Sequence, residues 1–96
     1  MCALRVKVKF FTTLREMVGK REEEYEFQKR ITVEELLRFI VEKYGKMAED
    51  YLFKNGKPKE SFSFLINGKS ISSQEGLNTK LKNGDILAIL PPVGGG

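Results

Sequence analysis

The first segment of the chain alternates between apolar and basic side chains. Residues 4 to 11 read LRVKVKFF, with an apolar residue at every even position and a basic residue at odd positions up to 9. Successive side chains of a β-strand point to opposite faces of a sheet, so this pattern predicts a strand with one buried and one solvated face. The buried face is expected to hold Leu4, Val6, Val8 and Phe10.

A helical pattern lies in the middle of the chain. In ITVEELLRFIVEKYG, residues 31 to 45, apolar residues recur three and four positions apart, which places them along one face of an α-helix. Thr32 and Glu35 have the spacing of a capping box, and Gly45 is a typical C-terminal stop. The pattern therefore predicts one amphipathic helix that is long enough to cross one face of a sheet.

Shorter elements surround this helix. TTLREMVG, residues 12 to 19, predicts a short helix with a capping box of Thr13 and Glu16 and an end at Gly19. The other segments of this half are predicted as a strand over 24–27, a short helix over 46–53 and a basic loop over 54–60.

The last third of the chain predicts strands separated by glycine turns. Residues 62 to 72, FSFLINGKSIS, indicate a hairpin that turns at Asn67-Gly68, because both turn positions favour a positive φ. Residues 81 to 90, LKNGDILAIL, indicate a turn and then the most apolar strand, which is expected at the sheet centre. The predicted class is α+β, with one sheet covered on one face by one main helix; the spacing leaves the strand order open.

Length and composition are consistent with one small domain. The 96 residues suffice for one core, and 41% of them are hydrophobic, which is enough to fold the chain. No apolar run approaches the roughly 20 residues that span a bilayer, and the first ten residues lack the apolar stretch of a signal peptide. A single cysteine, Cys2, excludes an internal disulfide. A cytoplasmic location without membrane contact is therefore expected.

The residue types that are missing exclude several kinds of catalytic site. The chain has no histidine, which removes histidine bases, Ser-His or Cys-His pairs and histidine-ligated metals. One cysteine cannot form a thiolate metal site, and no glycine-rich phosphate-binding motif is present. The chain is therefore expected to be a binder, carrier or subunit rather than an enzyme, and to bind no cofactor or metal itself.

Three stretches carry a resemblance to a known family. LREMVG, INGKSI and above all NGDILAILPPVGGG resemble the MoaD family, the ubiquitin-like sulfur carriers that form the small subunit of molybdopterin synthase; the resemblance covers essentially the whole chain. It implies a β-grasp fold in which the first and last strands are parallel central neighbours. The domain is then expected over residues 1–90 and a flexible Gly-Gly tail over 91–96. One departure is Gly94, where many members carry Ser, Thr or Ala.

The resemblance also implies a chemistry for the C-terminus. The carboxylate of Gly96 is ionised at neutral pH and is a poor electrophile. An ATP-using partner would convert it to an acyl-adenylate, and sulfur would then replace AMP to leave a thiocarboxylate that supplies sulfur to the pterin of the molybdenum or tungsten cofactor. The implied partners are an E1-like adenylating enzyme and the large subunit of molybdopterin synthase. The chain itself is expected to be a non-catalytic carrier, monomeric when alone.

The residues of the tail suit this role. Glycines have no side chains and so fit a narrow channel, while two prolines stiffen the base of the tail and cannot continue a strand. The tail comprises Pro91, Pro92, Val93, Gly94, Gly95 and Gly96.

An apolar docking face is expected beside the tail. If alternate residues of the last strand face the core, the others face outward, and the parallel pairing implied by the resemblance brings Phe11 next to Leu90. An exposed apolar patch marks an interaction site. The predicted interface comprises Phe11, Leu65, Ile86, Ala88 and Leu90. The alternative is that a helix or loop of the same chain covers this face.

Other functions remain open at this point. Related folds use the same tail for protein modification, in which Gly96 forms an isopeptide bond to a lysine, or for thiazole or tRNA thiolation. An unrelated alternative is a basic nucleic-acid-binding domain that uses Arg5, Lys7 and Lys9. Nucleic acid is not the expected partner, because acidic and basic residues are mixed and no exposed aromatic residues lie between the basic ones.

Overall fold

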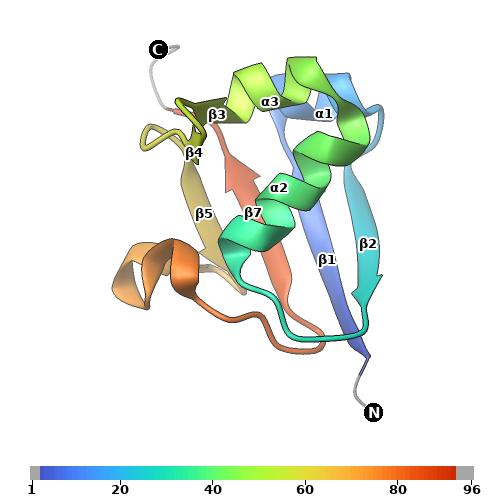
Figure 1. Cartoon of the computed structure of the whole chain (residues 1–96), viewed down its shortest axis with the longest axis vertical. Helices are drawn as coiled ribbons and strands as arrows, with labels where there is room; N and C mark the ends of the chain where they lie inside the picture. The colour runs from blue at the N-terminus through green and yellow to red at the C-terminus, as the bar shows by residue number, and fades with distance from the viewer. Residues whose placement is uncertain (1–2, 93–96) are drawn as a thin grey trace.

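The computed structural model describes residues 3–92 and contains a mixed five-stranded sheet crossed on one face by a long helix (Figure 1). The strand order is β2-β1-β7-β5-β6, with β1 and β7 parallel and the other neighbours antiparallel. The last strand therefore lies at the centre, beside the first, as predicted. The strands are β1 (Leu4–Phe10), β2 (Glu22–Phe27), β5 (Ser63–Ile66), β6 (Lys69–Ser70) and β7 (Ile86–Leu90).

The helices lie where the apolar periodicity placed them, and two turns of 3₁₀ helix follow β6. The elements are α1 (Thr12–Val18), α2 (Val33–Tyr44), α3 (Lys46–Leu52), η1 (Ile71–Ser73) and η2 (Gly76–Asn78). Figure 1 shows α2 running diagonally across the sheet, with α1 and α3 near its C-terminal end. Within residues 3–92, no helix has the length and apolar character needed to cross a membrane.

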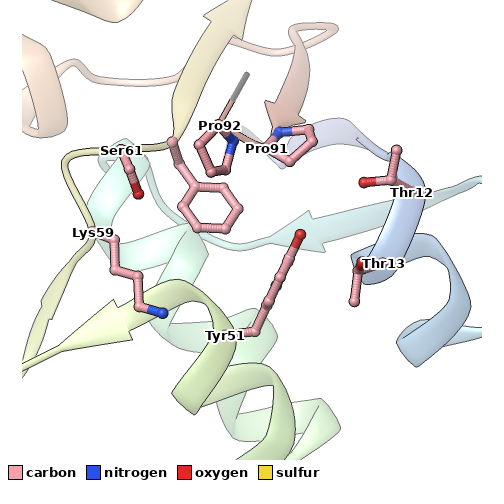
Figure 2. Close-up of a pocket in the computed structure, with 8 residues that line it drawn as sticks. Thr12, Thr13, Tyr51, Lys59, Ser61, Pro91 and Pro92 are labelled. Atoms are coloured by element: carbon pink, nitrogen blue, oxygen red, sulfur yellow. The ribbon is translucent and has the colours of Figure 1, made fainter. Parts of the chain in front are cut away.

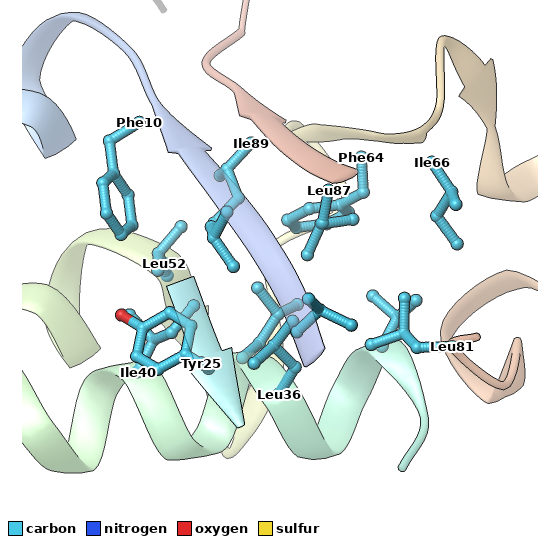
Figure 3. Close-up of a cluster of buried hydrophobic side chains, with 14 of the residues drawn as sticks. Phe10, Tyr25, Leu36, Ile40, Leu52, Phe64, Ile66, Leu81, Leu87 and Ile89 are labelled. Atoms are coloured by element: carbon cyan, nitrogen blue, oxygen red, sulfur yellow. The ribbon is translucent and has the colours of Figure 1, made fainter. Parts of the chain in front are cut away.

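The core lies between α2 and the inner face of the sheet (Figure 3). The parallel register pairs Val8 with Leu87, and both side chains are fully buried. Leu36 and Ile40 of α2 are also fully buried and pack against this face. The alternation of β1 and the helical spacing of α2 therefore meet in one apolar layer, because each pattern places its apolar residues on a single face.

One predicted helix cap is present and the other is not. The amide of Glu35 donates to Thr32 Oγ1 at 3.2 Å, and the amide of Thr32 donates to Glu35 Oε1 at 2.8 Å, which completes the capping box. The predicted box of Thr13 and Glu16 is wrong, because α1 begins at Thr12 and Phe11 is its N-cap without a side-chain hydrogen bond. Phe11 is still extended as the chain leaves β1, and the helix begins two residues too early for Thr13 to cap it.

The predicted basic loop is also partly wrong. Residues 53–58 form a small hairpin of β3 (Phe53–Lys54) and β4 (Lys57–Pro58). Asn55 and Gly56 both have positive φ, the conformation that a tight two-residue turn requires. The Asn-Gly pair in the sequence is a signal for such a turn, but the high lysine content of the segment favoured the prediction of a loop.

Two side chains couple the turns at the start of β7. Asn67, at φ 53°, donates through Nδ2 to Asp85 Oδ1 at 2.9 Å and accepts from the amide of Ile86 at 3.0 Å. Asp85 Oδ2 accepts from the amide of Lys82 at 2.8 Å. The NGK and NGD turns are thus joined by side-chain hydrogen bonds, which hold the beginning of the central strand in register.

Glu23 forms an ion-pair cluster that the sequence pattern did not predict. Strand β2 begins before the predicted residue 24, and Glu23 pairs with Val8 on the inner face of the sheet. Its carboxylate accepts from Tyr25 Oη at 2.7 Å, from Tyr44 Oη, and from the ammonium groups of Lys43 at 2.6 Å and Lys20 at 3.2 Å. Burial raises the pKa of Glu23, but these hydrogen bonds outweigh it and lower the pKa to about 2.

Replacement of Glu23 by glutamine should lower the free energy of unfolding by roughly 2 kcal/mol at pH 7, because charge-assisted hydrogen bonds are lost. A carboxylate with a lowered folded-state pKa stabilises the fold above its unfolded pKa. The difference between parent and variant should therefore shrink as the pH falls from about 4.5 toward 2. Urea denaturation across this range measures it. Glu24→Gln, on the exposed face of β2, is the control; an equal effect of both substitutions would contradict the prediction.

Candidate functional site

The base of the C-terminal tail lies at the end of the central strand. Strand β7 ends at Leu90, and Pro91 and Pro92 follow it outside the ladder, because proline has no amide hydrogen to donate. Both prolines are partly exposed. Val93 to Gly96 lie outside the described residues, so the prediction for the tail carboxylate stays a prediction.

The predicted docking residues lie on the sheet face opposite α2. Leu65 pairs with Ala88 across the antiparallel β5–β7 ladder, so their side chains share one face. The parallel register pairs Phe10 with Ile89, which brings Phe11, just beyond β1, next to Leu90. All five predicted residues, including Ile86, are partly exposed. Within residues 3–92, therefore, no helix or loop buries this face, contrary to the alternative of an internal cover.

The charged residues beside this apolar stripe are largely paired with one another. Arg5 lies 3.8 Å from Glu26, and Lys7 lies 3.4 Å from Glu22, across the β1–β2 ladder. Exposed ion pairs of this kind contribute little to stability, but they reduce the net positive charge of the face. This weakens the nucleic-acid interpretation of Arg5, Lys7 and Lys9, since two of the three basic groups face carboxylates.

A groove opens beside the tail base, with a volume of about 540 Å³. Figure 2 shows Pro91 and Pro92 at one edge of it, with Tyr51 across from them and Lys59 and Ser61 along one side. The ring of Tyr51 packs edge-on against that of Phe62, with centroids 5.1 Å apart. Sequence reasoning missed this groove, because its walls come from α1, α3, the segment after β4 and the end of β7.

The groove and the docking face contain no arrangement of groups for metal binding. Among residues 3–92, no three acidic, histidine or cysteine side chains lie together as metal ligands. The chemical groups that the groove offers are hydroxyls, one ammonium group and apolar surface.

Comparison with known proteins identifies the family. The sequence model of the ThiS family matches residues 8–96. The chain belongs to the ThiS family. Its resemblance to the MoaD-type ubiquitin-like sulfur carriers is thereby confirmed at the level of the family, and the β-grasp fold is confirmed by solved structures. The family match includes the glycine end of the tail.

Three known proteins are similar to this chain over nearly its whole length. Small archaeal modifier protein 3 of Haloferax volcanii is 31% identical over 97% of this chain and 100% of its own length. The molybdopterin synthase sulfur carrier subunit of Caenorhabditis briggsae is 33% identical over 95% of this chain and 96% of its own. The solution structure of small archaeal modifier protein 1 from Methanosarcina acetivorans superposes with a TM-score of 0.82 at 36% identity, over 100% of both chains.

Proposed function

We propose that this protein is a sulfur carrier whose reactive group is the terminal carboxylate of Gly96. The observation that carries the proposal is the position of the tail: it follows the central strand β7 directly and begins beside an uncovered apolar face. A partner that binds this face would receive the tail at a defined point. Membership of the ThiS family supports the same role.

The chemistry proceeds in two stages on an adenylating partner. A carboxylate oxygen of Gly96 attacks the α-phosphorus of ATP, which forms an acyl-adenylate and releases pyrophosphate. The terminal sulfur of a partner's persulfide then attacks the acyl carbon and displaces AMP. A second thiol cleaves the resulting sulfur–sulfur bond, which leaves a thiocarboxylate on Gly96 and a disulfide on the donor.

The side chains of this protein bind and position rather than react. Phe11, Leu65 and Leu90 offer apolar contact area to the partner, and Pro91 and Pro92 direct the tail away from the sheet. With no histidine in the chain and a single cysteine, activation has to come from the partner.

Two uses of the activated tail are consistent with the relatives. As the small subunit of molybdopterin synthase, the protein would bind a large subunit and deliver sulfur to a pterin precursor, the role named for the nematode relative. As a modifier, the role named for the archaeal relatives, it would form an isopeptide bond to a lysine. We propose the sulfur-carrier role first, because the match to the ThiS family and the name of the nematode relative both support it.

Intact mass spectrometry tests the proposal. After incubation with the adenylating enzyme of the same organism, ATP and a persulfide donor, the protein should gain the mass of one oxygen-to-sulfur exchange, located in the C-terminal peptide. Addition of a large synthase subunit and pterin precursor should return the carboxylate form. Sulfur on Cys2, or no change in mass, would contradict the carrier role; covalent adducts at lysines of added proteins would favour the modifier role.

A further inference from the structure

A cluster of three lysines lies next to the tail base, on and just after the β3–β4 hairpin. Lys54 and Lys57 are exposed, and Lys59 is partly exposed. These three lysines, the carboxylate residue Glu60 and Ser61 line a second hollow of about 510 Å³, which shares Lys59 and Ser61 with the groove at Pro91 and Pro92. Three cations against one carboxylate leave this hollow with a positive charge. The hollow beside the lysine cluster therefore adjoins the groove at the tail base, where Figure 2 shows Lys59.

The hairpin is held in place by the domain. Its Phe53 and Pro58 are buried. Arg38 of α2 donates to the carbonyl of Gly56 at 2.8 Å and lies 5.3 Å from the centre of the Phe53 ring. The amide of Lys59 donates to the carbonyl of Leu52 at 2.8 Å. The lysines are thus presented from an anchored backbone, and little ordering is needed when a partner binds.

Their charges have no partner in the part of the chain that the structure describes. Lys54, Lys57 and Lys59 form no ion pair there, although Glu60 follows directly in the sequence. On β1, by contrast, Arg5 and Lys7 each face a carboxylate of β2. The surface around the tail base therefore has two parts: an apolar face with neutralised charges, and a hairpin with excess positive charge.

We infer that the lysine cluster binds carboxylates on the adenylating enzyme, at the entrance of the channel that receives the tail. The inference rests on the proposed function. Four residues beyond Pro92 extend at most about 14 Å, and Gly96 has to reach the nucleotide. Lys59 lies at the base of the tail. When the tail extends into the channel, the lysine cluster therefore stays outside it. The cluster then contacts the surface of the adenylating enzyme at the channel entrance and does not reach the phosphates of ATP. Asp and Glu side chains there complement the lysines.

This arrangement would act mainly on association. Opposite charges on two surfaces increase the rate of encounter and fix the orientation, and salt weakens both effects. The apolar face then supplies the area that is desolvated. The lysine cluster therefore determines the rate at which the carrier binds the enzyme, while the tail determines whether the bound carrier reacts.

A first experiment needs no partner enzyme. Hexaglutamate peptide is titrated into the ¹⁵N-labelled protein at low salt, and amide shifts are followed. The largest shifts are expected at residues 54–61, and K57E/K59E should weaken binding by at least about fivefold. K69E/K82E changes the net charge by the same amount and replaces two exposed lysines near the opposite end of β5, so it is the matched control and should bind like the parent. Shifts centred on another basic region would overturn the inference.

A second experiment uses the adenylating enzyme of the same organism. ATP–pyrophosphate exchange is measured against carrier concentration in 50 mM and 500 mM NaCl. K57E/K59E should raise KM by about tenfold or more at low salt, with kcat unchanged, and this difference should fall below about threefold at high salt. An unchanged KM, or a loss confined to kcat, would overturn the inference. In the titration, a single-stranded oligonucleotide that binds the cluster more tightly than hexaglutamate would overturn it as well. If even the parent supports no exchange, the proposed function is wrong, and the peptide titration still decides the charge complementarity of the cluster.

Discussion

Addition of one alanine after Gly96 should abolish thiocarboxylate formation, with a rate at least about a thousandfold below that of the parent. The reacting carboxylate would be moved one residue along the chain, and the added methyl group would need space in a channel suited to glycine. A misplacement of the reacting atoms by one residue length, about 3.5 Å, removes the alignment that attack on the α-phosphorus requires.

The measurement is the mass assay with the adenylating enzyme, ATP and persulfide donor, and two further variants serve as controls. Deletion of Gly95 and Gly96 should also prevent the reaction but leave the melting temperature within about 2 °C of the parent, since the last strand ends at Leu90. Cys2→Ser should react as the parent does. Normal sulfur transfer to the extended variant would show that Gly96 is not the reactive end.

Leu90→Glu should weaken binding to the adenylating enzyme by about a hundredfold or more. Leu90 lies on the uncovered face at the end of β7, directly before the tail, so a docked partner has to desolvate it. A carboxylate buried there without a cation costs several kcal/mol. Phe11→Ala removes contact area without adding a charge and should weaken binding by about tenfold.

Binding is measured by calorimetry, with circular dichroism to verify the fold of each variant. Met47→Glu is the matched control, because Met47 is 71% exposed on α3, on the helical side of the domain. It should bind like the parent. If Leu90→Glu and Phe11→Ala both bind normally while folded, the partner docks on another face, and the role proposed for the open side of the sheet is wrong.

The sequence by itself determined the elements whose signals are local. The capping box of Thr32 and Glu35, the turn at Asn67-Gly68 and the alternation of β1 are each complete within a few residues. The outward-facing residues of β7 could be predicted for the same reason: once Leu87 and Ile89 face the core, Ile86, Ala88 and Leu90 have to face outward. The parallel neighbours β1 and β7 were expected from the family resemblance and not from the spacing.

Tertiary structure decided the features that depend on how distant segments are paired. Glu23 has the same residue type as Glu22 and Glu24, and only its register opposite Val8 brings it to Lys43 and the tyrosines on the helical side. The groove beside Pro91 and Pro92 combines segments that lie tens of residues apart, and whether a lysine is paired or free depends on which strand lies next to it. A local sequence pattern predicts which face of its element a side chain lies on. The residues that it contacts on that face depend on the packing of distant segments, and each of these contacts depends on the others.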